Sequence, residues 1–284
     1  MTKIIHISDV HMCPPGGTVV TFDPAARLAA TIRRINRDHA DAALCVVSGD
    51  LADRGDEASY RRLRSLVAEL RVPVRLMLGN HDARGPFRTV FPDAPVDEAG
   101  FVQAVADLGV VRVVTLDSLD EEMPSAGRLC ERRLAWLSGV LAAEPEQATI
   151  VFLHHPPFPI GVEYFDPMLL EDGATLLDLL GRFPGVRHIA FGHVHLSVSG
   201  RRGRLSFSST RGLAHPMDVA LAGDTVQYVD RPPAYEILLV GGDDLMVHHA
   251  AVSESERVVA SERIDPDGRT GTLTILDSGV QAAS

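Results

Sequence analysis

Short apolar runs alternate with amphipathic stretches over the first two hundred residues of the chain. The apolar runs are bounded by polar turn residues, which predicts buried strands, and the amphipathic stretches keep an apolar stripe at helical spacing. Asp23 and Pro24 give the first helix an N-cap and a proline suited to the first helical position. Strands are expected at 3–8, 42–50, 74–82, 110–118, 148–155 and 187–195, and helices at 24–39, 56–70, 131–143 and 172–183. The alternation predicts a layered α/β domain with parallel strands at its centre.

The pattern changes after residue 195. The remaining β-like segments are separated by glycine-rich turns, and "GGDD" at 241–244 has the composition of a hairpin turn. These segments lie at 203–210, 235–240, 245–252 and 271–277. We expect them to form a second, mostly antiparallel sheet. The corresponding domain prediction is a core at 1–210 and a β-rich segment at 211–284, which completes the second sheet, caps the site or lies in an oligomer interface.

Composition limits the class of function. The 284 residues are 45% hydrophobic, enough for the core of one large or two modest domains. The formal net charge of −11 lacks the basic character of a protein that binds polymeric nucleic acid. It does not exclude a small anionic ester held by metal ions, because a local cationic site can override the global field.

The chain also lacks signals for export or membrane insertion. Its start, "MTKIIHISD", is too short in apolar residues for a signal peptide, and no run approaches the roughly 18 apolar residues of a membrane span. Cys13, Cys45 and Cys130 are odd in number and widely spaced, which favours a reducing compartment over a disulfide framework. We therefore expect a cytoplasmic protein that does not associate with membranes.

Residues able to bind metal ions stand at the carboxyl end of five predicted strands, where open α/β sheets bind ligands. The sequences at these ends are "SDVH", "SGD", "GNHD", "HH" and "GHVH". Each alone has an ordinary explanation as a turn or a chance pairing. Residues two apart on an extended segment point to the same side, so Asp9 and His11 are able to bind one ion, and His193 and His195 face the same side of their segment. The coincidence of five such ends in order argues for a metal site.

The ordered motifs D-x-H, G-D, G-N-H-[DE], H and G-H-x-H resemble the signature of the calcineurin-like metallophosphoesterases. They read here as 9–11, 49–50, 79–82, His154 and 192–195, and the resemblance covers roughly residues 3–210. The chain looks most like the bacterial phosphodiesterases that act on cyclic nucleotides and glycerophosphodiesters. The resemblance implies a four-layer αββα sandwich, in which helices flank two mixed sheets.

The resemblance also implies two metal ions that share one carboxylate. One ion's set is Asp9, His11, Asp50 and His195, and the other's is Asp50, Asn80, His154 and His193. Mixed nitrogen and oxygen ligands suit iron, manganese, zinc or cobalt. In this interpretation His81 stabilises the developing charge and donates a proton to the leaving group, and Asp82 orients a histidine through its other ring nitrogen.

Other histidines are given lesser roles. His6 is expected in the core or behind the ligands, and His155, next to a ligand on a strand, is expected to point away from the site. His215 is a candidate for the substrate mouth. Residues that bind substrate are not identified, although the aromatic loop 156–171 either lines an apolar mouth or packs on itself.

The predicted activity is hydrolysis of small phosphodiesters by a metal-bridging hydroxide, in a homo-oligomeric enzyme. Two alternatives remain open at this point. One is a broad phosphomonoesterase, and the other is a non-catalytic scaffold of the same fold, against which the full set of ligand residues argues.

Overall fold

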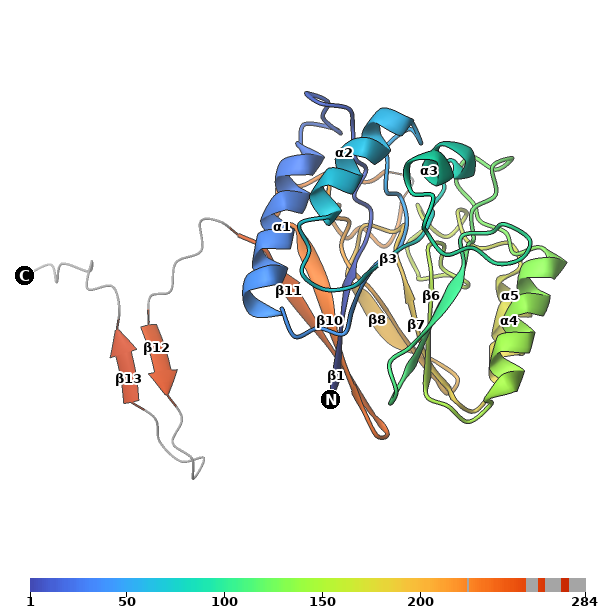
Figure 1. Ribbon diagram of the computed structural model, residues 1–284. Helices are drawn as coiled ribbons and strands as arrows, with labels where there is room; N and C mark the ends of the chain where they lie inside the picture. The colour runs from blue at the N-terminus through green and yellow to red at the C-terminus, as the bar shows by residue number, and fades with distance from the viewer. Residues whose placement is uncertain (224, 254–259, 264–271, 276–284) are drawn as a thin grey trace, which may run out of the picture. The chain divides into compact units, whose positions relative to one another are not determined.

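The computed structural model describes residues 1–223, 225–253, 260–263 and 272–275 (Figure 1). Contacts divide the chain into a large unit, Met1–Val252, and a small unit, Ser253–Ser284. Within the small unit, β12 (Ala260–Arg263) pairs antiparallel with β13 (Thr272–Ile275). All features described below belong to the large unit.

The first sheet of the large unit has the strand order β11-β10-β1-β2-β3. Its strands β1, β2 and β3 are parallel, and β10 and β11 extend it antiparallel beside β1. Their bounds are β1 (Thr2–Ile7), β2 (Leu44–Val47), β3 (Val74–Leu76), β10 (Ala234–Gly241) and β11 (Asp244–Ala251).

The second sheet has the order β4-β5-β6-β7-β9-β8, parallel from β5 to β9 with an antiparallel strand at each edge. Its strands are β4 (Ala104–Asp107), β5 (Arg112–Thr115), β6 (Thr149–Leu153), β7 (Val186–Phe191), β8 (Val198–Arg202) and β9 (Leu205–Ser209). Both sheets are therefore mixed, as the family resemblance implies.

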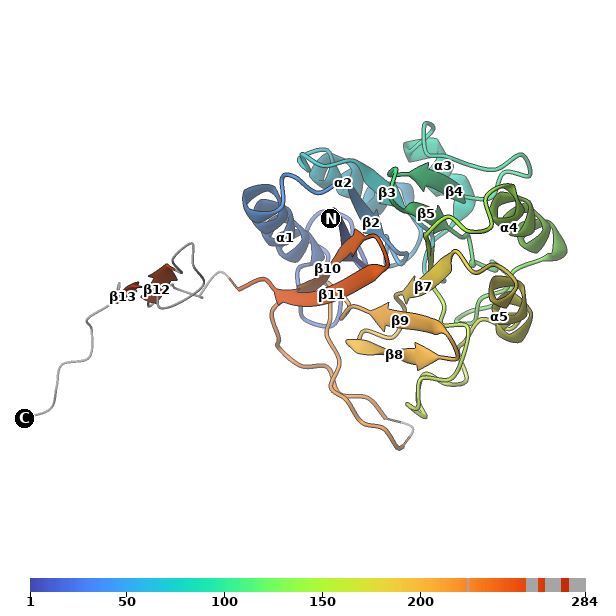
Figure 2. The same cartoon turned by 90° about the horizontal axis from the view of Figure 1, so that it is seen from below.

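Three apolar clusters fill the spaces between four layers. The first packs α1 (Pro24–Asp38), α2 (Glu57–Val67) and α3 (Arg84–Val90) on the outer face of the first sheet. The second packs α4 (Glu131–Ala143) and α5 (Gly173–Gly181) on the second sheet. A third, with residues such as Ile4, Val46 and Phe152, joins the two sheets. Figures 1 and 2 show α1 and α2 on one side of the sheets and α4 and α5 on the other, which confirms the predicted αββα sandwich.

The expected antiparallel second sheet of C-terminal segments is wrong. Residues of 203–210 form β9 in the six-stranded sheet, and the hairpin β10–β11 belongs to the first sheet. Sequence alternation identifies a strand but not its neighbour. Tyr235 and Leu238 of β10 pack into different clusters on opposite faces, so this strand needs a helix layer on one side and a sheet on the other. The expected domain boundary at residue 210 stays a prediction.

Polar side chains also lie buried between the sheets. The His6 ring is 2.6 Å from Glu236 Oε2 through Nδ1 and 2.7 Å from Ser48 Oγ through Nε2. Ser208 donates to the same Glu236 oxygen, and its Oγ is 3.0 Å from His188 Nε2. His6 is thus a core residue, as expected, and it belongs to a hydrogen-bonded network that joins strands of both sheets.

This network predicts acid sensitivity through His188. Burial lowers the pKa of His188 from 6.5 to about 4, although the charge of Glu236 acts to raise it. Below pH 6.5 the unfolded chain therefore binds a proton that the folded chain excludes, and the free energy of unfolding falls by about 3 kcal/mol between pH 7 and pH 4. In His188→Gln this contribution to the fall in the free energy of unfolding at acid pH should disappear. Urea unfolding at a series of pH values measures the effect.

Exposed His248 on β11 offers the matched control. His248→Gln should follow the wild-type pH profile. Equal acid sensitivity of wild type and His188→Gln would contradict the prediction.

Candidate metal centre

The loops that follow β1, β2 and β7 have an unusual backbone. Five residues there take left-handed conformations, with φ between 44° and 71°: Asp9, His11, Asp50, His193 and His195. Such conformations cost on the order of 1 kcal/mol each for residues other than glycine, and they concentrate at functional sites. The strands themselves end at Ile7 and Phe191. Asp9 and His11 thus face one point because of left-handed turns, and the expectation of an extended segment is wrong.

Hydrogen bonds between the loops hold these turns. The amides of Asp9 and His11 donate to the carbonyls of Gly49 (3.1 Å) and Asp50 (2.8 Å). The His193 amide donates to Asp9 Oδ1 at 3.0 Å, and the His81 amide donates to Asp50 Oδ1 at 3.0 Å. The loops are therefore tied to one another beyond the ends of their strands.

One cluster comprises Asp9, His11, Asp50 and His195, all buried, with one ligand atom from each lying within 4.8 Å of the others. His11 Nε2 is 3.3 Å from His195 Nε2 and 3.5 Å from Asp50 Oδ2. His195 Nε2 is 3.5 Å from Asp9 Oδ1. These four residues are the set predicted from sequence for one ion.

A second cluster shares Asp50. Its Oδ1 is 3.3 Å from His154 Nε2, while Oδ2 faces the first cluster. His193 Nδ1 is 3.0 Å from Asn80 Oδ1, and ring nitrogens of His154 and His193 lie within 4.8 Å of each other. The two clusters thus bring together all seven residues predicted as ligands, with one oxygen of Asp50 directed to each.

The donor atoms fit metal ions. His154 Nδ1 donates to the Ser48 carbonyl at 2.8 Å, and His195 Nδ1 donates to the His215 carbonyl at 3.1 Å. These bonds leave the lone pair on Nε2 directed into the clusters, which is the usual arrangement for a metal-binding histidine. Buried Asp9 Oδ2 and His154 Nε2 have no hydrogen-bond partner. Ligands about 2.1 Å from an ion lie about 3.0 to 3.4 Å apart, close to the separations found here.

Electrostatics lead to the same conclusion. Burial opposes a charged His154, but the adjacent Asp50 carboxylate raises the pKa of His154 to about 9. Burial likewise disfavours the Asp50 carboxylate, yet the neighbouring histidines His154 and His11 hold the pKa of Asp50 well below its usual range. The buried carboxylates therefore require positive charge beside them, which either protons or metal ions supply.

A sequence profile of the calcineurin-like phosphoesterases matches residues 2–197, a span that contains both clusters. The chain belongs to the calcineurin-like phosphoesterase family. Members of this family are hydrolytic phosphoesterases, and the clusters described above contain His and Asp groups that could hold a binuclear metal site.

Individual calcineurin-like relatives cover most of the chain. The chain is 38% identical over 252 residues to a probable cyclic nucleotide phosphodiesterase of Rhodopseudomonas palustris. The aligned region spans 88% of this chain and 92% of the relative. The chain is also 31% identical over 237 residues to a glycerophosphodiester phosphodiesterase of Enterobacter lignolyticus, and this alignment spans 81% of the chain and 84% of the relative. The crystal structure of a dimetal phosphatase from Danio rerio superposes with a TM-score of 0.67 at 17% identity, over 89% and 97% of the two chains, and supports the fold.

No helix in the described part of this phosphoesterase is long and apolar enough to cross a membrane.

Two histidines outside the predicted ligand set lie at the centre. His155 was expected to point away, and this is wrong: its ring centroid is 4.9 Å from those of both His154 and His193. Ser118 Oγ, 2.8 Å from His155 Nδ1, orients the ring. The His215 ring is tilted by 37° against the His195 ring, with their centroids 4.2 Å apart, and burial lowers the pKa of His215 far below the usual range. The sequence marked His215 only as a candidate, because no motif surrounds it.

Asp82 has different partners from those expected. Its carboxylate accepts from the amides of Gly79, Leu51 and Ala52 and from the Tyr60 hydroxyl, at 2.9 to 3.0 Å, and from no histidine ring. It therefore fixes the backbone just after Asp50 and just before Asn80. Asp53, which sequence reasoning missed, lies 3.6 Å from His11 Nδ1.

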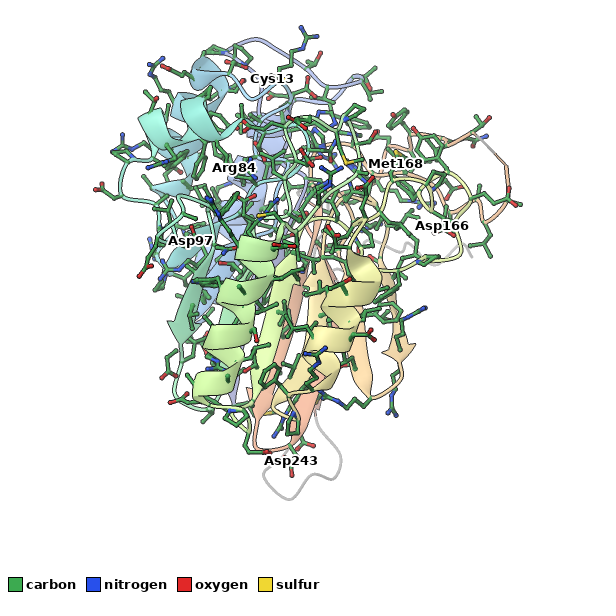
Figure 3. The ribbon with its side chains drawn as sticks, turned by 90° about the vertical axis from the view of Figure 1, so that its right-hand side faces the viewer. Cys13, Arg84, Asp97, Asp166, Met168 and Asp243 are labelled. Atoms are coloured by element: carbon green, nitrogen blue, oxygen red, sulfur yellow. The ribbon has the colours of Figure 1, made fainter. Side chains whose placement is uncertain are left out.

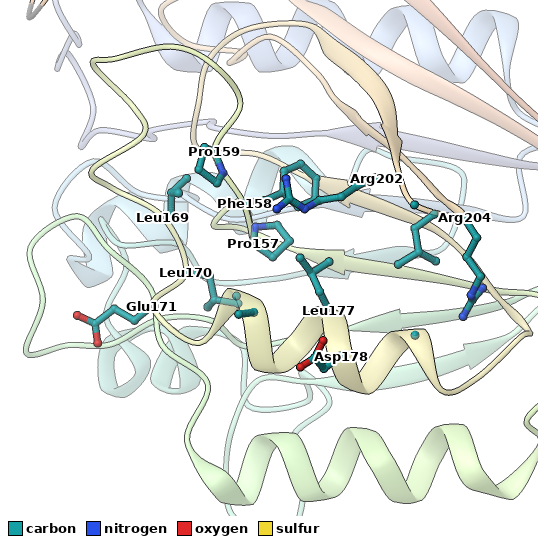
Figure 4. A pocket seen from close by; sticks show the side chains of 15 residues that line it. Pro157, Phe158, Pro159, Leu169, Leu170, Glu171, Leu177, Asp178, Arg202 and Arg204 are labelled. Atoms are coloured by element: carbon teal, nitrogen blue, oxygen red, sulfur yellow. The ribbon is translucent and has the colours of Figure 1, made fainter.

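The centre lines a pocket of about 390 Å³ that also contains His81 and parts of the loop 156–171. A larger hollow of about 820 Å³ lies behind that loop, between α5 and the β8–β9 turn (Figure 4). None of the described residues that line the larger hollow is a histidine. The smaller pocket is therefore the one equipped for metal chemistry. It lies at the end of the molecule that carries Met168, opposite Asp243 in the β10–β11 turn (Figure 3).

Gly79 gives a direct test of the shared carboxylate. A Cβ atom at this position would lie 2.2 Å from Asp50 Oδ1 and 2.6 Å from His154 Nε2. Gly79→Ala should therefore displace both groups and lower the bound metal by at least one ion per chain, as measured by elemental analysis of Mn²⁺-loaded protein.

Gly85 on α3 is the matched control, because a Cβ there meets nothing within 4 Å. Gly85→Ala should keep the wild-type metal content. Full metal content in Gly79→Ala would argue against Asp50 and His154 as ligands.

Proposed function

We propose that this protein hydrolyses small phosphodiesters, cyclic nucleotides or glycerophosphodiesters, at a binuclear centre. One ion would be held by Asp9, His11, Asp50 and His195, and the other by Asp50, Asn80, His154 and His193. The convergence of these groups and the names of the relatives support the proposal. Imidazole nitrogen with carboxylate oxygen favours iron, manganese, zinc or cobalt over magnesium or calcium.

The charged residues that line the pocket favour a diester as the substrate. Among its described lining residues none is lysine or arginine. A phosphodiester carries one negative charge and a monoester nearly two at neutral pH. No lysine or arginine among the described lining residues is available to bind the second charge of a monoester, which favours the diester. The absence of basic lining residues also fits a small substrate better than polymeric nucleic acid.

The ions, when bound, supply Lewis-acid activation of water and of the phosphoryl oxygens. The protein's own residues position the substrate and protonate the leaving group. In the net reaction a P–O ester bond breaks, a water oxygen bonds to phosphorus, and one proton goes to the leaving alkoxide. His81 is suited to deliver that proton. Its Nδ1 donates to the Asp53 carbonyl at 2.9 Å, so its Nε2, when protonated, remains available to the substrate.

Two further expectations accompany the proposal. Cys13, Cys45 and Cys130 are free cysteines, which supports a cytoplasmic location. We expect a homo-oligomer, which light scattering of the purified protein will test.

The substrate class predicts a simple rate comparison. With Mn²⁺ present, the wild-type enzyme should hydrolyse bis-p-nitrophenyl phosphate faster than p-nitrophenyl phosphate, because no lysine or arginine in the described lining is available to bind the second negative charge of the monoester. Monoester turnover well above diester turnover would favour a broad phosphomonoesterase. Absence of both activities in protein with two bound ions would favour a non-catalytic scaffold.

The residue roles predict two distinct losses. Asp50→Ala should lose metal and activity together, because it removes the shared ligand. His81→Ala should keep both ions and lower kcat roughly 100-fold or more on a diester with a poor leaving group, since general acids contribute about that much. Metal analysis and steady-state rates on the same samples measure both effects. Near-wild-type turnover by His81→Ala on such a diester would show that His81 has another role.

A further inference from the structure

The mouth of the pocket is apolar and comes from three distant segments. Val20 lies in the loop after β1, Tyr164 in the loop 156–171, and Tyr228 in the segment before β10. The floor is formed by the charged and imidazole groups of the metal centre. A substrate's phosphate would thus lie on the floor while its organic substituent contacts these three side chains.

Val20 has a strained backbone. Its φ is 57°, a conformation that is a genuine outlier for a β-branched residue. It lies in a tight turn closed by hydrogen bonds between Val19 and Phe22 in both directions, at 3.0 and 2.9 Å, where glycine or asparagine is the ordinary choice. The Val20 side chain is 51% exposed, so it contributes little to the core. Strain without compensating burial at the edge of a site points to a role in binding.

Aromatic rings connect the floor to the mouth along two paths. From the first cluster, the His195 ring lies 4.2 Å from His215, which lies 5.5 Å from Tyr228. From the second, the His193 ring lies 6.3 Å from Phe165, which packs edge-on at 5.0 Å against Tyr164.

The two paths end close together at the mouth. Partial burial raises the pKa of Tyr228, and the nearby Tyr164 adds to the effect. Tyr228 is still 46% exposed. Tyr164 is partly buried against the second apolar cluster, but both tyrosines line the pocket, where a ligand can reach them.

The chemistry of this mouth selects among diesters. It offers two tyrosine rings and a valine, and none of the described lining residues is a lysine or arginine able to bind a second anionic group. A flat, uncharged heterocycle matches these surfaces because any base stacks on an aromatic ring. A glycerol or ethanolamine substituent has no such face.

We infer that Val20, Tyr164 and Tyr228 form a subsite for the base of a nucleoside phosphodiester, so that the enzyme prefers cyclic nucleotides to glycerophosphodiesters. The inference rests on the proposed diesterase function and adds the substituent that the site recognises. Val20 determines specificity here and takes no part in the chemical step.

The experiment compares kcat/KM for 3′,5′-cyclic AMP and for glycerophosphoethanolamine in Mn²⁺-loaded full-length protein. The wild type should favour cyclic AMP. Val20→Gly should lower the ratio of the two values roughly fivefold, mainly by raising KM for cyclic AMP. The base would lose apolar contact with about half of the valine surface. The thermal midpoint of this variant should not fall, because glycine adopts φ near 57° freely. A residue that served only the fold would not give loss of selectivity with retained stability.

Tyr228 provides a second pair of variants. Tyr228→Phe should keep the ratio, because the ring remains, and Tyr228→Ala should lower it roughly tenfold. Val110, 53% exposed in the turn between β4 and β5 at the other end of the sheet, is the matched control, and Val110→Gly should leave both values unchanged.

The possible failures are distinct. Diester hydrolysis without preference for cyclic AMP, or a ratio unchanged in Val20→Gly and Tyr228→Ala, would overturn the subsite while leaving the proposed function. Absence of diester hydrolysis in metal-loaded protein, with monoester hydrolysis present, would overturn both.

Discussion

The left-handed turns at the carboxyl ends of the strands are the constraint on which the centre depends. Five of the seven predicted ligands have positive φ values. Each such residue is held at a cost on the order of 1 kcal/mol. The three apolar clusters between the layers offset that cost, since a sandwich with buried residues on both faces of each sheet leaves the strand ends no freedom to relax.

The shared carboxylate extends this constraint to the neighbouring loops. Asp50 accepts a hydrogen bond from the His81 amide and directs one carboxylate oxygen to each cluster. Asp82 accepts hydrogen bonds from three nearby backbone amides and from the Tyr60 hydroxyl, and the absence of a Cβ atom at Gly79 leaves space for the Asp50 carboxylate. The result is a rigid, negatively charged floor that is suited to bind metal cations.

The mouth is built differently from the floor. Val20, Tyr164 and Tyr228 all lie in loops. Val20 and Tyr228 are each about half exposed, and Val20 lies in a strained turn. Loops carried by a rigid scaffold vary without disturbing the fold. Family members can therefore share one metal chemistry and differ in the ester that they accept, which agrees with the mixture of names among the relatives.

The sequence alone predicts the layered fold, the order of the main helices and strands other than α3, β4 and β8, and the seven clustered residues proposed as ligands. These residues could be grouped because the carboxyl ends of parallel strands lie at one edge of a sheet. The sequence also placed His6 in the core. Local pattern could not assign β9, β10 and β11 to their sheets, since alternation is the same beside any neighbour. Three features required the tertiary structure: the left-handed turns at Asp9 and His11, the place of His155 beside the proposed ligands His154 and His193, and the position of Val20 and Tyr228 in the lining of one pocket. These depend on backbone torsions and on contacts between residues far apart in the chain, which no local sequence pattern encodes.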